Sequence, residues 1–138
     1  MNEKQFITSV AQRAETDVEG AGAITYAVFQ ELRERITPKE AFDVASQLPV
    51  DLQVLWLENE RIDRGVRKTH ETEFLARVRY YASLATVDDA ERGVRAVFAT
   101  LQEALGSTSG IEGESWDIFS QLPKDLKKMW LSAHQPQA

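Results

Sequence analysis

Residues 46–57, with the sequence SQLPVDLQVLWL, recur at residues 120–131 as SQLPKDLKKMWL, and eight of the twelve positions are identical. Each copy contains a proline, Pro49 or Pro123, which fits the first position of a helix because its missing N–H is not needed there. The aspartate two residues later lies in the first turn, where the helix dipole favours a negative charge. Apolar side chains then follow at spacings of three and four residues, which is one face of a helix. The repeated sequence therefore predicts a corner followed by a short amphipathic helix, twice in one chain.

The repetition extends over most of the chain. Phe6 and Val10 are matched by Phe74 and Val78, 68 residues later, and the segment around Val28 is matched 69 residues later. The offset rises to 74 at the repeated sequence, because the second copy carries a longer loop rich in Gly and Ser at residues 106–113. Apolar residues keep a helical spacing in both copies, and no stretch alternates as a half-buried strand does. The sequence therefore predicts one helical pattern written twice.

Capping signals predict where the helices of the first copy begin. The first helix begins with a pair that resembles a capping box, Asn2 and Gln5. The second begins with the capping box Thr16–Glu19, and the third with the capping box Thr37–Glu40, which also has a proline at the first helical position. The fourth helix is predicted at residues 49–57. It could continue into the segment that joins the two copies, or that segment could form a bend.

The predicted fold class is all-α. A lone unit of about 60 residues buries only about 60% of its unfolded surface and is marginal in stability, so we expect the two copies to pack on each other. This gives an eight-helix pseudo-twofold bundle made of two four-helix repeats in one compact domain. The predicted organisation is a first repeat at 1–60, a connector at 61–69, a second repeat at 70–134 and a tail at 135–138.

Composition excludes several classes of function. No apolar stretch approaches the roughly 20 residues that span a bilayer, and the N-terminus lacks the apolar region of a secretory signal. Cysteine is absent, which suits a reducing compartment, so we expect a cytoplasmic protein without membrane contact. The net charge of −6 argues against nucleic-acid binding. Residues 61–70 are a small positive island with a net charge of +3, either a solvated segment or a contact for acidic groups.

The order of these motifs resembles the bacterial domain-of-unknown-function family numbered 2267. The resemblance covers nearly the whole chain, as two tandem copies, and the second copy departs from it where residues 106–113 replace the Thr-Pro-x-Glu start of the third helix. It implies a small, soluble, helical bacterial protein with no established activity, so it supplies no catalytic residue. The pieces that carry it are Phe6 with Val10, and the segments 27–32, 36–41 and 47–52.

Catalytic chemistry has little support in the sequence. Of the two histidines, His70 has one carboxylate, Glu73, at helical spacing, whereas di-iron bundle sites need two such motifs and two further glutamates. Ser46 and Ser120 have no histidine nearby in the sequence and no nucleophile elbow. The many acidic side chains, Glu40 and Asp43 among them, are interpreted as solvated or as matching helix dipoles. We therefore expect no catalytic residues, no metal site and no cofactor.

Four residues form a candidate interaction surface: Val50, Val54, Trp56 and Trp130. The tryptophans either anchor the core or line a groove for a partner helix. Val50 and Val54 are apolar on the expected outer face of the fourth helix, where the second copy has lysines. We expect a non-enzymatic protein-interaction or scaffold module, with an unidentified protein partner or a homodimer. The alternative is a small-molecule- or metal-binding enzyme built as a helical bundle.

Overall fold

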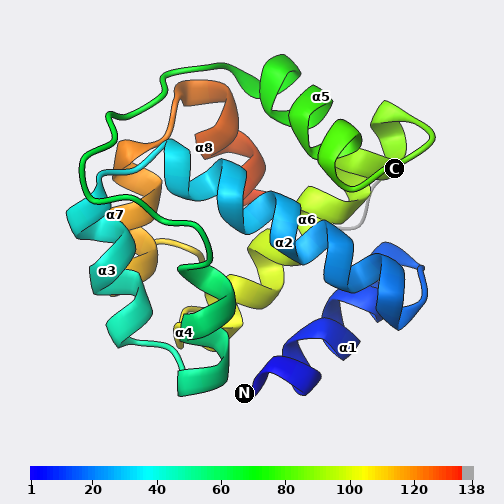
Figure 1. The fold of residues 1–138 in the computed structure, drawn as a ribbon, viewed down its shortest axis with the longest axis horizontal. Helices are drawn as coiled ribbons and strands as arrows, with labels where there is room; N and C mark the ends of the chain where they lie inside the picture. The colour runs from blue at the N-terminus through cyan, green and yellow to red at the C-terminus, as the bar shows by residue number, and fades with distance from the viewer. Residues whose placement is uncertain (135–138) are drawn as a thin grey trace.

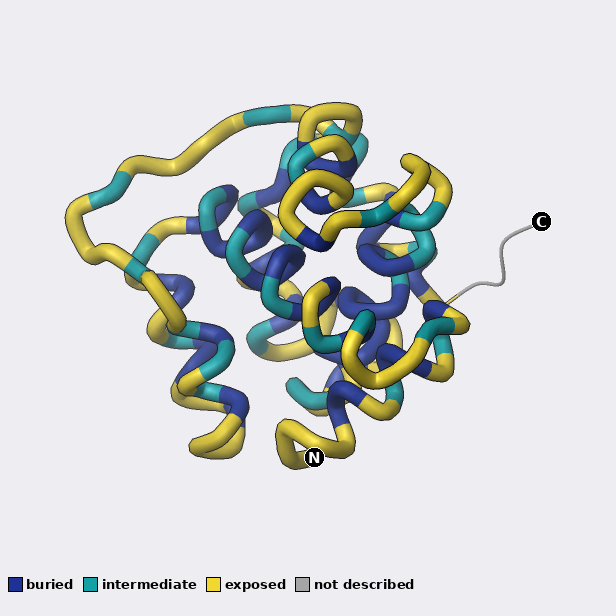
Figure 2. The backbone as a smooth tube through the Cα atoms, turned by 45° about the vertical axis from the view of Figure 1, so that its right-hand side comes forward, coloured by how far each residue is buried: buried dark blue, intermediate teal, exposed yellow. Residues whose placement is uncertain are grey.

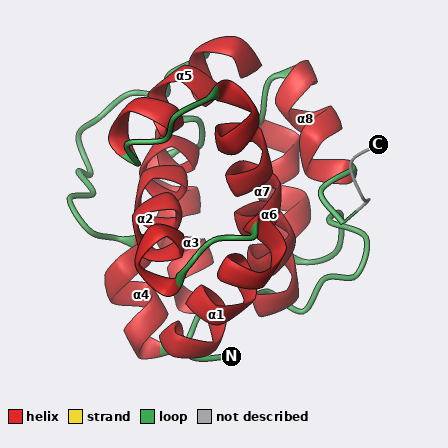
Figure 3. Cartoon of the chain, turned by 90° about the vertical axis from the view of Figure 1, so that its right-hand side faces the viewer, coloured by secondary structure: helices red, strands yellow, loops and turns green. Residues whose placement is uncertain are grey.

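The computed structural model describes residues 1–134, and these residues form eight helices and no strand (Figure 3). The predicted all-α class is therefore correct, while the predicted tail at 135–138 lies outside the described residues. None of the helices in this range is both long enough and apolar enough to cross a membrane. The helices are α1 Glu3–Ala14, α2 Val18–Glu34, α3 Pro38–Ser46, α4 Val50–Trp56, α5 Glu71–Tyr81, α6 Val87–Ala104, α7 Glu114–Gln121 and α8 Lys124–Leu131.

Two of the three predicted capping residues in the first half are confirmed. Asn2 forms a full capping box with Gln5 at the start of α1, and the Thr37 hydroxyl accepts from the N–H of the residue three positions on, with proline at the first position of α3. The prediction for α2 was wrong by one residue. Asp17, not Thr16, is its N-cap, because the Asp17 carboxylate accepts the N–H of Gly20 at 2.7 Å.

The connector between the two halves is not a continuation of α4. That helix ends at Trp56 and is followed by a turn at residues 57–59. Asn59, the last residue of this turn, adopts a left-handed conformation with φ of 63°. The chain then runs without helical structure around the outside of the molecule to α5 (Figure 1). It is held against the end of α2, where the N–H of Arg67 donates to the carbonyl oxygen of Glu34 at 2.7 Å.

Helices α2 and α6 cross near the middle of the molecule and organise the core. α1 packs mainly against α6, and α5 packs against α2, so each half places its first helix on the second helix of the other half (Figure 1). At the crossing, a Cβ on Gly93 would lie 2.8 Å from Ile24 Cγ2, so a larger residue would force the Ile24 side chain to shift. Buried apolar residues from all eight helices form one continuous core (Figure 2). The two halves therefore share an interior, as expected for units too small to fold alone.

Candidate functional site

The four residues of the candidate interaction surface lie in two different environments. Val50 and Val54 are 76% and 69% exposed on α4, as expected for an outer face. Trp56 and Trp130 are fully buried, so neither lines a groove that a partner could reach. Of the two interpretations of the tryptophans, the structure supports the core anchor. The candidate surface is thereby reduced to Val50 and Val54, and its role stays a prediction.

Both tryptophans anchor the core in the same way. The Trp56 indole N–H donates to the carbonyl oxygen of Ala41 at 2.7 Å, and the Trp130 indole N–H donates to that of Gly110 at 2.6 Å. Each indole also contacts a phenylalanine ring of the long helix in its own half, with centroids 5.1 and 5.0 Å apart. A large apolar ring with its one polar group satisfied is well suited to a buried position.

A second pair of matched aromatics is more exposed than the sequence indicated. Trp116 on α7 corresponds to Phe42 on α3, and this match favoured core filling at that position. Trp116 is instead 50% exposed and Phe42 is 42% exposed, so neither ring fills the core. Helices α3 and α7 contact each other, and the buried positions of the two helices include Ala41, Val44 and Ile118. One face of each short helix is enough to close the core, which leaves the bulky rings outside.

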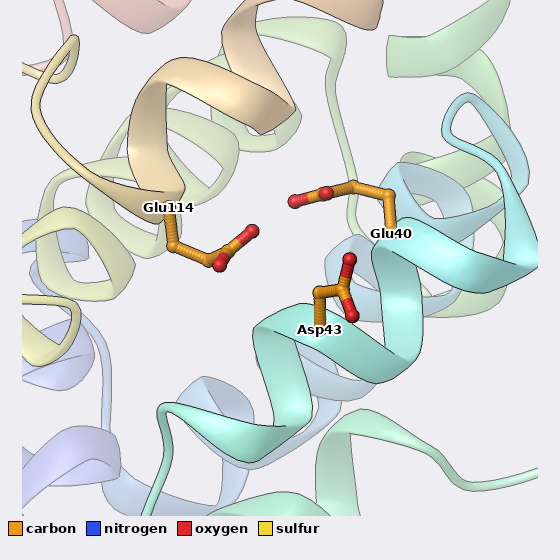
Figure 4. Close-up of side chains that lie close together, drawn as sticks. All are labelled: Glu40, Asp43 and Glu114. Atoms are coloured by element: carbon orange, nitrogen blue, oxygen red, sulfur yellow. The ribbon is translucent and has the colours of Figure 1, made fainter.

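An acidic cluster lies where α3 meets α7, and the sequence did not predict it. Glu40 was expected to reach back to the N–H of Thr37, but that N–H donates to Gln121 Oε1 at 2.8 Å instead. The Glu40 side chain points across the junction toward Glu114, with Asp43 beside it (Figure 4). One carboxylate oxygen from each of these three residues lies within 4.8 Å of the other two.

Glu40 is the buried member of this cluster. Its side chain is 6% exposed, and Oε2 has no hydrogen-bond partner. Glu114 Oε2 is likewise enclosed and unpartnered, whereas Asp43 accepts a hydrogen bond from Lys39 Nζ at 3.0 Å. Burial raises the pKa of Glu40 to about 9, helped by a hydrogen bond and repulsion from Glu114 and by the charges of Asp117 and Asp43. A metal-free protein therefore holds a proton on Glu40 at neutral pH.

The sequence did contain a signal for this cluster. Glu114 follows Glu40 by 74 residues, and Asp117 follows Asp43 by the same 74, which is the offset of the repeated SQLP sequence. Matched positions near the contact of two repeats can meet each other in space. Each carboxylate was interpreted as solvated because its own helix gave no reason to bury it, and the contact between α3 and α7 supplies that reason.

Arginines of the positive island contact acidic groups of both halves. Arg64 binds both oxygens of Glu60, each at 2.7 Å, and also donates to the carbonyl oxygen of Ile36. Arg67 forms ion pairs with Glu34 and Glu73. Of the two interpretations of residues 61–70, contact with acidic side chains of this chain is therefore the one that describes these two arginines.

A buried carboxylate that binds two arginines, one from each half, lies near the core. Glu31 on α2 and Arg35 at its end are both fully buried, and Arg35 Nη1 lies 2.9 Å from Glu31 Oε1. Arg77 on α5 donates to the same oxygen at 2.7 Å. The Arg35 guanidinium also lies over the ring of Phe74, 4.9 Å from its centroid. Sharing one carboxylate between two guanidinium groups fixes α5 against α2, and its role is structural.

The histidines and the repeated serines contribute to none of these clusters. His70 is mostly exposed, with Nδ1 3.5 Å from Asp125 Oδ2, and His134 contacts Gln102 near the C-terminal end of the described chain. Ser46 and Ser120 each donate to a backbone carbonyl oxygen three residues earlier, the pattern of a helix-end hydroxyl. Among residues 1–134, the acidic cluster is the group of side chains with metal-ligating chemistry.

Comparison with known proteins gives a family but no relative of known activity. No curated protein matches the chain. The profile of a family described as an uncharacterized conserved protein, DUF2267, matches residues 3–129, which include all of α1 to α7 and most of α8. This chain therefore belongs to the DUF2267 family.

Proposed function

We propose that the protein is a non-enzymatic interaction module whose contact surface is the outer face of α4, and whose partner is an amphipathic helix with an apolar stripe and basic flanks. The observation that carries the proposal is the exposed pair Val50 and Val54, one helical turn apart. Apolar side chains at this spacing fit the stripe of a partner helix. Asp51 and Glu58 are exposed near them, and residues 1–60 carry a net charge of −6, which favours a basic partner.

The difference between the two halves supports this surface. The positions equivalent to Val50 and Val54 are Lys124 and Lys128 on α8, which are exposed as well. The fold therefore has no need of apolar residues at these positions. Valine instead of lysine on α4 makes that face capable of binding an apolar stripe, and lysine on α8 prevents the same contact there.

We further propose that the molecule consists of two tandem copies of one bacterial four-helix unit. Matched contacts support this: Asp51 accepts the N–H of Glu3 at 2.8 Å, and Asp125 accepts the N–H of Glu71 at 2.9 Å. Each contact ties the first residue of a half's first helix to the first turn of that half's fourth helix. The absence of cysteine from the sequence is in keeping with a place in the cytoplasm.

The double variant Val50→Ser, Val54→Ser tests the surface. The matched control is Val18→Ser, Val87→Ser, which removes two other exposed valines, 62% and 47% exposed. Each protein is used to capture partners from a lysate of the source cells. Each captured partner is then purified, and its affinity for wild type and for both variants is measured directly. We expect a partner that binds wild type and the control directly and loses at least about tenfold in affinity to the α4 variant. A partner that binds both variants equally would refute the surface, and loss of self-association alone would identify a second copy as the occupant.

The alternative function, a small-molecule- or metal-binding enzyme, has one observation in its favour: the acidic cluster of α3 and α7. A large shift in melting temperature with one class of metabolite would favour it, because a ligand that binds only the folded state stabilises that state. The α4 variant separates the two functions, since it should leave such a shift unchanged.

A further inference from the structure

The junction of α3 and α7 contains enclosed carboxylate oxygens for which no other residue supplies a donor, so only a proton shared between Glu40 and Glu114 would join them. Glu40 is 6% exposed and its Oε2 has no partner, and Glu114 Oε2 is enclosed without a partner as well. Their side chains point toward each other from helices of different halves (Figure 4). Like charges held this close, out of water, destabilise the folded state unless a proton or a cation neutralises them.

Two features distinguish this junction from an ordinary acidic surface. Glu40 gives up the capping hydrogen bond that its position in α3 offers, because Gln121 takes the N–H of Thr37. The Glu40 carboxylate is thereby left to point into the junction. In addition, Lys39, the cation next to Glu40 in the sequence, is exposed and forms its ion pair with Asp43, so it leaves the buried oxygen of Glu40 without a counter-charge.

The spacing of the oxygens selects a class of cation. All donors are carboxylate oxygens, which suit hard divalent cations and not zinc or copper sites built from nitrogen and sulfur. Three oxygens within 4.8 Å of one another fit around one ion whose metal–oxygen distances are about 2.3–2.6 Å, the range for Ca²⁺. Mg²⁺ binds at about 2.0–2.1 Å and demands near-ideal octahedral geometry, so a site formed by side chains of two separate helices suits the more variable coordination of Ca²⁺ better.

We propose that Glu40, Asp43 and Glu114 bind one divalent cation of the calcium class at the junction of α3 and α7, with water completing its coordination. Asp43 and Glu114 are only partly buried, so water and the ion can reach the site. The ion joins one helix from each half of the molecule, and its binding stabilises the contact between them. This site is separate from the α4 surface and does not depend on it.

The experiment uses the full-length protein, first freed of metal with a chelator. Tb³⁺ replaces Ca²⁺ in oxygen sites and luminesces when a nearby tryptophan is excited, and Trp116 stands two residues after Glu114 on α7. We expect saturable Tb³⁺ luminescence that Ca²⁺ displaces, and calorimetric Ca²⁺ binding at one site. Glu114→Gln and Asp43→Asn should each weaken Ca²⁺ binding by at least about tenfold. The control Asp88→Asn, which removes an exposed carboxylate on α6, should bind as wild type does.

The variant Glu40→Gln separates a loss of calcium binding from a loss of folding. It replaces the buried carboxyl group with a neutral amide of the same shape, so the metal-free protein should stay folded by circular dichroism while it loses Ca²⁺ binding. Three results would overturn the proposal: no saturable Ca²⁺ binding by about 1 mM, the weakest class of protein calcium site; unchanged binding in the Glu40, Asp43 and Glu114 variants; or an equal loss in the Asp88→Asn control. Folded Glu40→Gln protein together with no calcium binding by wild type would show that a proton alone neutralises the pair.

Discussion

Replacing Glu40 by glutamine should stabilise the metal-free protein relative to wild type by an amount that grows with pH. The pKa of Glu40 is raised from 4.5 to about 9 in the folded protein, chiefly by burial and then by its hydrogen bond to Glu114. A raised carboxyl pKa means that the folded state holds a proton that the unfolded chain releases. Its contribution to stability is complete below the unfolded pKa and is lost as the pH rises toward the folded pKa. Glutamine keeps the shape and has no proton to lose.

The size of the effect follows from one proton. The free energy of unfolding of wild type falls by about 1.4 kcal/mol for each pH unit between the two pKa values. From about pH 5.5 to about pH 7.5, the gap between Glu40→Gln and wild type should therefore widen by up to about 2.7 kcal/mol. Glu114 is partly exposed, so water screens the repulsion, and a widening of about 1.5 kcal/mol is the lower figure we expect.

Urea unfolding followed by circular dichroism, in the presence of a chelator, measures this gap at each pH. Only the difference between the two proteins is interpreted, because every other titrating group is common to both. Asp88→Asn sets the background for the loss of one exposed carboxylate. Parallel stability curves for wild type and Glu40→Gln across this pH range would refute the reasoning, since they would show that Glu40 ionises in the folded protein as it does in the unfolded chain.

Three further substitutions test the packing. Gly93→Ala should destabilise the protein by about 1–3 kcal/mol because its Cβ would meet Ile24, whereas Gly22→Ala, which meets nothing within 4 Å, should stabilise α2 by about 1 kcal/mol. Urea unfolding measures both, and a harmless Gly93→Ala would contradict the close crossing of α2 and α6. Glu31→Ala should cost about 3–5 kcal/mol in the same assay, because it leaves the buried Arg35 with only its longer ion pair to Glu34, at 3.6 Å; a loss under 1 kcal/mol would show that the pair is solvated. Trp130→Phe should cost about 1–3 kcal/mol in thermal unfolding, since the buried carbonyl of Gly110 loses its donor, and no loss would mean that water replaces the indole.

The local structure could be predicted from the sequence because its causes are local. The Asn2 capping box, the Thr37 cap with its proline, and the apolar spacing of the long helices depend on residues within a few positions of one another. The prediction for Thr16 was wrong for a related reason: the neighbouring Asp17 is the better capping residue, and its carboxylate accepts the N–H of Gly20, so the helix begins one residue later. The repeat also predicted that two marginal units would share one core.

The acidic cluster could not be predicted in this way. Glu40 has a local use as a capping residue, and only the arrival of Gln121 from the other half removes that use. Burial of Glu40 likewise depends on α7 lying against α3. The exposure of Trp116 and the burial of Glu31 are further examples, because each is set by the neighbouring helix and not by residue type.

The sequence by itself determined the helices, their order and the anchoring role open to the two tryptophans, because helical spacing and caps act over one or two turns. Only the tertiary structure decided which charged groups lose water. Desolvation depends on what packs against a side chain from elsewhere in the chain, and a single sequence does not encode that as a local pattern. The three carboxylates between α3 and α7 acquire their chemistry from that contact alone.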